Sequence, residues 1–221
     1  MAGPTINAVN TVGSGSAGSA SWSYTVTGVS ANDTILLFII NNTNANPTLT
    51  PSSVTDAQGS YALLATATAA FNPNVSVWAL TNANAGTHNV TVTWASAVSG
   101  AITSATFSSA GGSFVDKSAG AFLGSSTTQS VTLTNAQTND TVVSFCYAGA
   151  APSAQTGTAW FTGGSIGVGI TGQYQAQSGT GAITPSYTYA AATFGAFVAV
   201  SLQNNIPITP YVPYPQAFLA Q

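Results

Sequence analysis

The sequence has almost no charged side chains. Only 2% of its 221 residues are charged, with no arginine and no glutamate, and the formal net charge at pH 7 is −3. Ordinary soluble domains carry about 25% charged residues. Nucleic-acid binding needs lysine and arginine to neutralise phosphates, and the same side chains attract proteins to anionic membranes. The composition therefore excludes a nucleic-acid partner and attraction to a membrane surface.

The side chains that perform chemistry are also scarce. His88 is the only histidine, and its place at the start of a strand predicts an exposed strand-edge residue rather than a catalytic base. The four aspartates lie in separate turns. Asp33 and Asp140 each precede a strand, where aspartate commonly caps its own backbone, and Asp116 and Lys117 are expected to form a local surface pair. We therefore expect a protein that is not an enzyme and has no cofactor.

One carboxylate lies where a cation could bind. Asp56 and Gln58 share the turn that ends at Gly59, and calcium accepts carboxylate, amide and carbonyl oxygens as ligands. Because a single carboxylate gives weak affinity, an ordinary turn is the favoured interpretation, and we expect no metal site.

Two short apolar runs are the most informative features of the sequence for its fold. Residues 35–40 are apolar without interruption, too few to span a bilayer and too β-branched for a helix. An Asn-Asp-Thr turn precedes this run, and the same three residues recur before a second run at 142–147. A short continuous apolar run between turn residues is typical of a strand covered on both faces. We predict a sandwich with one central strand in each half, and interpret the only cysteine, Cys146, as a small buried hydrophobe in the second of them.

Other segments alternate apolar and polar residues, as half-buried strands do. Trp22 and Trp94 fall on the apolar faces of two such segments, at 21–27 and 89–95, and are expected in the core. Residues 47–59 are interpreted as a long irregular loop, and no segment has the 3.6-residue apolar period of a helix. The predicted fold is all-β: a single antiparallel β-sandwich of jelly-roll type.

The two ends of the sequence differ from its middle. Residues 1–20 are predicted to form an N-terminal strand or arm and a Gly-Ser linker, and residues 21–203 the sandwich domain. In residues 204–221 four prolines exclude strand pairing and favour an extended C-terminal arm. The arm is too apolar for an ordinary linker, so we favour an arm that contacts a neighbouring subunit over a floppy tail. The expected contact residues are Ile206, Ile208, Tyr211, Tyr214, Phe218 and Leu219.

The order of features between residues 21 and 203 resembles a family of jelly-roll-like β-sandwich domains. Members occur in bacterial secreted or surface proteins and as phage virion surface or decoration proteins. The matching features are the apolar run at 35–40, the Asp-x-x-Gly turn at 56–59, the strand at 75–80, the Gly-x-x-x-Val-Thr-Val strand at 86–92 and the closing strand at 196–202. Ser60 replaces the asparagine that usually follows the family's turn, and the scarcity of charge is a second departure. The resemblance implies a structural, decoration or adhesion role.

Three observations predict a function. The N-terminus has neither the basic nor the apolar region of a secretory signal, and the surface should be nearly uncharged. In addition, some members of the family that the sequence resembles are virion proteins. We expect a non-enzymatic structural protein of a virion exterior, on the virion surface, whose partners are copies of itself or a major capsid protein.

Two alternatives stay open. One is a secreted surface or adhesion module, extracellular or at the cell surface, that binds glycans through Trp160. The other is a subunit of an extracellular filament, in which the C-terminal arm completes a neighbour's sheet.

Overall fold

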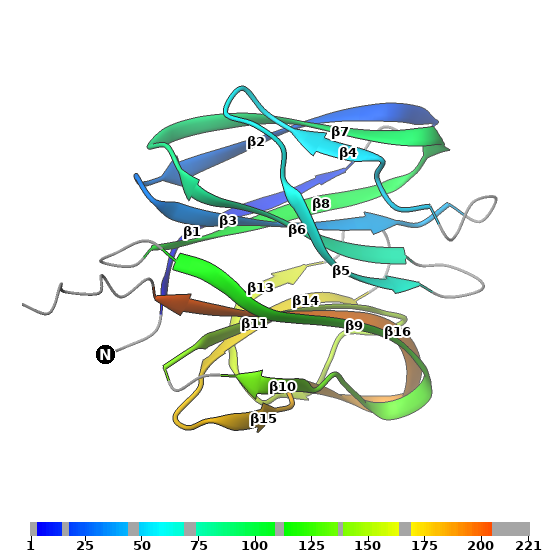
Figure 1. Cartoon of the computed structure of the whole chain (residues 1–221). Coiled ribbons are helices and arrows are strands. Elements are labelled where there is room, and N and C mark those ends of the chain that lie inside the picture. The colour runs from blue at the N-terminus through cyan, green and yellow to red at the C-terminus, as the bar shows by residue number, and fades with distance from the viewer. Residues whose placement is uncertain are drawn as a thin grey trace, which may run out of the picture.

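Figure 1 shows the computed structural model of the chain, which describes residues 4–14, 18–43, 49–68, 74–108, 113–136, 139–163 and 169–204. These residues form antiparallel sheets packed face to face, without any helix. No helix in the described ranges could therefore cross a membrane. The prediction of an all-β sandwich fold is confirmed.

The described residues of the first half form eight strands. They are β1 (Thr5–Ser14), β2 (Ser19–Val29), β3 (Asp33–Asn41), β4 (Ser53–Thr55), β5 (Ala62–Thr68), β6 (Asn74–Ala83), β7 (Gly86–Val98) and β8 (Gly100–Ser108). Five of them form a sheet in the order β1-β8-β3-β6-β5, and the other three form a covering sheet in the order β2-β7-β4. Strand β4 lies in the segment that we predicted to be irregular, so that expectation is wrong for these three residues.

The second half repeats this arrangement. Its strands are β9 (Ser113–Ser130), β10 (Leu133–Ala136), β11 (Thr141–Ala148), β12 (Ala154–Gln155), β13 (Thr158–Gly163), β14 (Gly169–Ala176), β15 (Gly181–Ile183) and β16 (Ser186–Asn204). The main sheet has the order β9-β16-β11-β14-β13, which is the order of the first sheet with eight added to each strand number. In the first half, β7 pairs with both β2 and β4. In the second half these two pairings are divided: β10 pairs with β15, and β12 pairs with the first residues of β16.

The recurring Asn-Asp-Thr motif marks equivalent turns in the two halves. Asn32 and Asn139 have φ angles of 68° and 70°, in the left-handed region that asparagine tolerates better than most residues. Their backbone N–H groups donate to the carbonyl oxygens of Ala83 and Gln177, over 2.8 and 2.9 Å. The two motifs thus open the central strands β3 and β11, and the prediction of one central strand in each half is confirmed.

Alternate residues of β3 belong to two different apolar layers. Leu36, Phe38 and Ile40 lie in the central layer, between the two five-stranded sheets. Ile35, Leu37 and Ile39 lie in the layer beneath β2, β7 and β4, together with Trp22 and Trp94. The ring centroids of these two tryptophans are 4.2 Å apart, and both side chains are buried as predicted. The apolar run of β3 is therefore explained by burial on both faces.

Strand β11 has the same double burial. Val143 and Phe145 face the central layer, whereas Val142 and Cys146 face a third apolar layer beneath β10 and β15. Figure 1 shows the resulting stack, in which the two main sheets lie at the middle and a smaller sheet covers each outer face.

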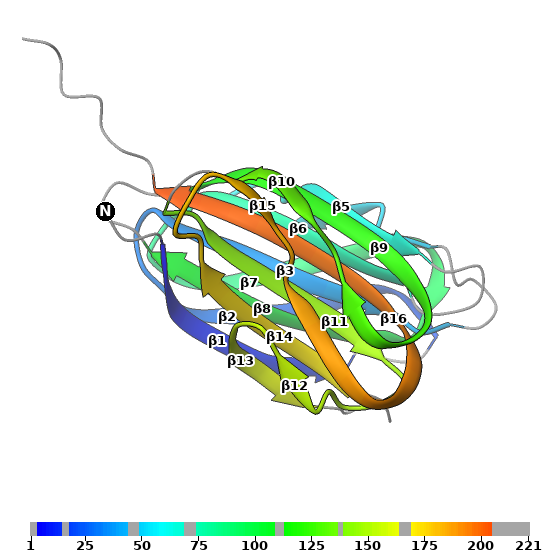
Figure 2. The ribbon, with the colours of Figure 1, turned by 90° about the horizontal axis from the view of Figure 1, so that it is seen from below.

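The two main sheets approach closely where β5 lies beside β9 (Figure 2). The Ser118 hydroxyl donates to the carbonyl oxygen of Leu64 over 2.7 Å. A Cβ atom at Gly120 would collide with the carbonyl oxygen of Thr66, so only glycine permits this approach. The backbones of β5 and β9 therefore close one side of the central layer.

Apart from Asn204, which ends β16, the predicted C-terminal arm lies outside the described residues, and so do all six of its expected contact residues. Strand β16 ends at Asn204, and β1 pairs with β8. The jelly-roll type and the predicted domain boundaries stay predictions.

Candidate functional site

The four aspartates do not converge. Asp33 and Asp140 are fully buried at the starts of β3 and β11. The Asp33 Oδ2 atom accepts hydrogen bonds from the backbone N–H of Ser30 at 2.9 Å and from the Asn7 side chain at 2.8 Å, so the predicted backbone cap is confirmed here. Asp140 accepts a hydrogen bond from the hydroxyl of Ser201. Each carboxyl group thus links the start of a central strand to a neighbouring strand, β1 for Asp33 and β16 for Asp140.

Asp116 and Lys117 form the ion pair that the sequence predicts. The Lys117 Nζ atom is 3.9 Å from Asp116 Oδ1, with 44% of the lysine side chain and 16% of the aspartate side chain exposed. An exposed pair of this kind contributes little to stability, about 0–1 kcal/mol.

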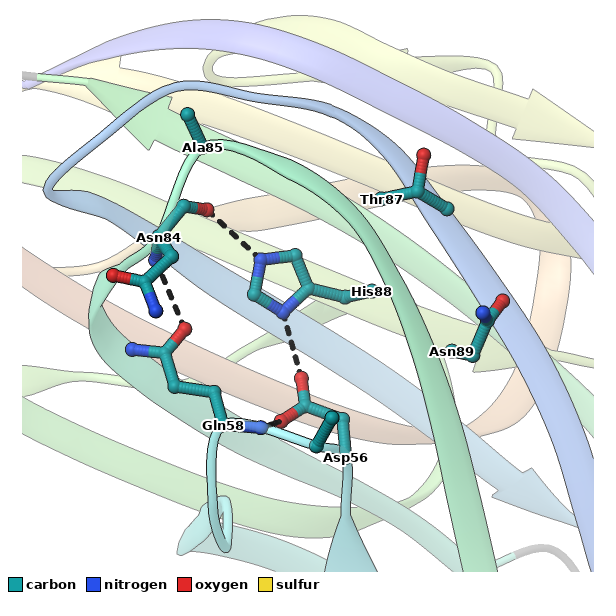
Figure 3. A pocket seen from close by; sticks show the side chains of 8 residues that line it. Asp56, Gln58, Asn84, Ala85, Thr87, His88 and Asn89 are labelled. Carbon is teal, nitrogen blue, oxygen red and sulfur yellow. Dashed lines mark hydrogen bonds and ion pairs between the residues drawn. The ribbon is translucent and has the colours of Figure 1, made fainter.

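Asp56 and His88 meet in a buried pair that sequence reasoning missed. The His88 Nδ1 atom is 2.7 Å from Asp56 Oδ2, and the two side chains are only 7% and 2% exposed. Strand β4 pairs with β7, which brings the turn after β4 beside His88 (Figure 3). The expectation of an exposed His88 is therefore wrong, because the neighbouring turn covers the ring.

Both ring nitrogens of His88 face hydrogen-bond acceptors. Nδ1 faces the Asp56 carboxylate, and Nε2 lies 3.0 Å from the backbone carbonyl oxygen of Asn84 (Figure 3). A carbonyl oxygen only accepts, so both bonds form together when both nitrogens carry hydrogen. No ring nitrogen is left to remove a proton from a substrate. This geometry suits a structural clamp and argues against a general base.

The Asp56 carboxylate is surrounded by donors. Oδ1 accepts from the backbone N–H groups of Gln58 at 2.7 Å and Gly59 at 3.1 Å, and Oδ2 accepts from the Tyr61 hydroxyl at 3.0 Å as well as from His88. This is a side-chain-stabilised turn of the kind that aspartate favours. With four donors on its two oxygens, the carboxylate has no lone pair directed at a cation. In the described residues there is also no cluster of three or more His, Cys, Asp or Glu side chains that could hold a metal.

These contacts shift two pKa values. Burial raises the pKa of Asp56, but the hydrogen bonds from His88, Gln58, Tyr61 and Gly59 outweigh it, and the net pKa lies below the ordinary 3.8. Burial and the adjacent negative charge of Asp56 raise the pKa of Tyr61 well above 10.0. Asp56 is therefore an acceptor and Tyr61 a donor throughout the neutral range.

A hollow of about 270 Å³ lies over this pair. One side is formed by the turn that contains Asp56 and Gln58, and the other by the β6–β7 turn and the beginning of β7 (Figure 3). The Gln58 amide joins the two sides, donating to the carbonyl oxygen of Asn82 at 3.1 Å and accepting from the backbone N–H of Asn84 at 2.9 Å. The Gln58 side chain thus links the two sides of the hollow.

Trp160, the predicted glycan contact, is half-buried at the edge of the central layer. Its ring centroid is 5.3 Å from that of Phe38 and 6.2 Å from that of Phe145, and its indole N–H donates to the carbonyl oxygen of Gln173 at 3.2 Å. The indole also lies against Gly172 on the neighbouring strand, where a Cβ atom would collide with it. These contacts account for the tryptophan as a packing residue, and its role toward glycans stays a prediction.

Cys146 is buried, as predicted. Its Sγ atom lies 3.3 Å from the Tyr189 hydroxyl, and burial raises the pKa of the thiol to about 12. The reactive thiolate is therefore disfavoured at neutral pH.

Comparison with known protein families, with curated proteins and with solved structures finds no significant match to this chain.

Proposed function

We propose that this chain is a non-enzymatic structural protein of a virion exterior, a capsid decoration or surface protein that associates with copies of itself. The observation that carries the proposal is where the folded chain places its few charges.

The outer surface is almost free of charge. Asp33 and Asp140 are fully buried, and Asp56 is buried against His88. Only the neighbouring Asp116 and Lys117 remain partly exposed, and their charges are opposite. Folding thus removes most of the formal charge from the surface and leaves a local pair that cancels.

A surface without net charge does not keep copies of a protein apart, because no long-range repulsion opposes their contact. Contacts between such surfaces also change little with salt. Large apolar side chains are exposed on the same surface: Leu63, Phe114, Phe122 and Phe194 are 46%, 40%, 37% and 50% exposed. Aromatic side chains of this kind are enriched at protein–protein interfaces. Together these features favour dense association of copies.

The state of the chemically active groups supports a role without catalysis. Both nitrogens of His88 are engaged, the Asp56 oxygens are occupied by donors, and the thiol of Cys146 is buried with a raised pKa. The virion setting rests on the family resemblance of the sequence, and the partner contact on the predicted arm.

Association is tested by restoring charge to the surface. Ser125 and Thr127 are exposed on β9, and replacing both with glutamate adds two negative charges to the formal net charge of −3 without touching the core. We expect the wild type to form large species in sedimentation velocity and the glutamate variant to remain dispersed at low salt. The matched glutamine variant, which adds bulk without charge, should associate like the wild type. A wild type that stays monomeric at every concentration would refute self-association.

The arm and the virion setting need separate tests. A chain ending at Asn204 should melt at the wild-type temperature yet fail to assemble, since the sandwich already ends with β16. Normal assembly of this truncated chain would show that the arm is not a contact. Immunogold electron microscopy of particles from the native source should place the chain on the virion exterior, whereas labelling of cell surfaces or filaments would favour one of the two alternatives.

A further inference from the structure

Strand β9 lies at an edge of the second main sheet. It pairs with β16, and among the described residues no strand is paired with its other side. Figures 1 and 2 place this edge beside β5, and the hydrogen bond from the Ser118 hydroxyl to the Leu64 carbonyl oxygen fixes where the two strands meet. Leu63 and Lys117 immediately precede these two residues, and Phe114 lies just before Lys117 on β9. The first residues of β9 and β5 therefore share one stretch of surface.

This stretch carries the exposed side-chain charge of the protein. Lys117 is the only lysine, and the sequence has no arginine. Asp33 and Asp140 are fully buried and the Asp56 side chain is 2% exposed, so Asp116 is the only aspartate with an appreciable exposed fraction. An ion pair between two copies that uses lysine must therefore use Lys117, and the carboxylate open to it is that of Asp116.

Within one chain these two charges are poorly paired. The Lys117 Nζ atom lies 3.9 Å from Asp116 Oδ1, which is too far for a hydrogen bond. Asp116 Oδ2 is buried without a hydrogen-bond partner. Asp116 is also the extra residue of a β-bulge, because its neighbours Val115 and Lys117 are paired with consecutive residues of β16. A carboxylate oxygen without a donor is costly, and a second ammonium group has donors to supply.

We propose that this edge is a contact between two copies of the chain related by a two-fold axis, in which Lys117 of each copy pairs with Asp116 of the other. Adjacent opposite charges are self-complementary, since two copies facing each other in antiparallel directions bring each charge to its opposite. The exposed side chains of Leu63 and Phe114 bury apolar surface beside the two ion pairs. This inference rests on the self-association proposed above and names the surface through which it occurs.

Chemical cross-linking of the unaltered chain tests the contact directly. A zero-length carbodiimide joins an amine to a carboxylate only where the two groups touch. In an equal mixture of unlabelled and heavy-nitrogen-labelled protein, mass spectrometry should find Lys117 of an unlabelled chain joined to Asp116 of a labelled chain. No variant is used, so a change in folding cannot produce or hide this result.

Charge exchange tests the same contact in sedimentation velocity. Asp116→Lys brings the net charge of −3 closer to zero, so a general charge effect predicts association at least as strong as in the wild type. The two-fold contact instead predicts association weaker by about tenfold or more, because lysines then face lysines. Lys117→Asp should also weaken association, and an equal mixture of the two variants should restore it. Thr127→Lys, exposed towards the other end of β9, is the control and should associate like the wild type.

The apolar part of the contact has its own pair of variants. Phe114→Ser should weaken association by about tenfold or more, as loss of a buried aromatic anchor does. Phe194→Ser is the matched control, because Phe194 is equally open to solvent but adjoins Gly195, which pairs with Leu123 much farther along β9. All variants should melt near the wild-type temperature, since an exposed ion pair and exposed side chains contribute little to folding.

Three results would overturn the contact. One is an associated wild type in which no Lys117–Asp116 link joins two chains. Another is stronger association of Lys117→Asp, because the lysine would then guard an open edge against pairing. Either result leaves self-association standing. The third is a wild type that stays monomeric at every concentration, which refutes self-association and this contact together.

Discussion

Replacing Asp56 by alanine should destabilise the protein, whereas replacing it by asparagine should be mild. The carboxylate accepts four hydrogen bonds, two of them from the buried side chains of Tyr61 and His88. Alanine leaves both buried donors without a partner. Asparagine keeps an oxygen for the two backbone N–H groups of the turn and places its N–H₂ group beside Nδ1 of His88, which accepts in the tautomer that donates from Nε2 to Asn84.

The size of each effect follows from these contacts. The backbone donors of the turn belong to exposed residues and can bind water, so their loss costs little. A buried donor left unpaired costs about 1–3 kcal/mol, and breaking a buried ion pair costs about 3–5 kcal/mol. We therefore expect a loss of about 3 kcal/mol for Asp56→Ala and about 1 kcal/mol for Asp56→Asn. For a chain of this length these values correspond to melting temperatures lower by about 6–12 °C and about 2–4 °C.

The acid dependence gives an independent check. The pKa of Asp56 is lower in the folded protein than its ordinary value of 3.8, so the unfolded chain binds the proton more readily. The stabilisation is fully present above that ordinary value and is lost as the pH falls through the folded pKa. The advantage of the wild type over Asp56→Asn should therefore shrink below about pH 4.

Differential scanning calorimetry of the three proteins from about pH 7 down to about pH 2 measures both effects, within the range where the linkage argument applies. Two results would refute the reasoning. One is an unchanged melting temperature for Asp56→Ala at neutral pH. The other is a difference between the wild type and Asp56→Asn that stays constant across the whole pH range.

Three further predictions concern packing and reactivity. Gly120→Val should destabilise the protein by about 1–3 kcal/mol in urea unfolding, because its Cβ would meet the Thr66 carbonyl oxygen; Gly124→Val, with open space around it, should be nearly neutral, and equal effects would contradict the close β5–β9 approach. Trp160→Ala should lower stability by about 2–4 kcal/mol and Trp160→Phe by less, as measured by melting, since part of the ring packs in the central layer. Cys146 should resist iodoacetamide at neutral pH until the protein unfolds, as followed by mass spectrometry, and rapid labelling of the native protein would contradict its burial.

Some of the fold could be predicted because its signals are local. The run at 35–40 is apolar at every position, rich in β-branched residues and bounded by turn residues, which is typical of a strand buried on both faces. The Asn-Asp-Thr motif recurs because asparagine tolerates the left-handed turn that opens each central strand. Trp22 and Trp94 alternate with polar neighbours, which places each on the apolar face of its strand. Each of these inferences needed only a few adjacent residues.

The repeat of the whole strand order could be inferred only in part from the sequence. The second copy of the motif showed that two central strands exist, but short strands such as β12 and β15 carry too few residues for a periodic pattern. The stacking of the two main sheets depends on which faces are apolar and on the close approach at Gly120, and neither sets a local pattern.

The sequence by itself determined the all-β class, the two central strands and the scarcity of charge, since each follows from residue types and spacing. Tertiary structure alone decided the candidate site. Asp56 and His88 are 32 positions apart, and they meet because β4 pairs with β7, whereas a single histidine in a sequence has no pattern that names its partner. Trp160 likewise turns inward because Gly172 on the next strand leaves space for its ring, and that neighbour is set by strand register rather than by sequence proximity.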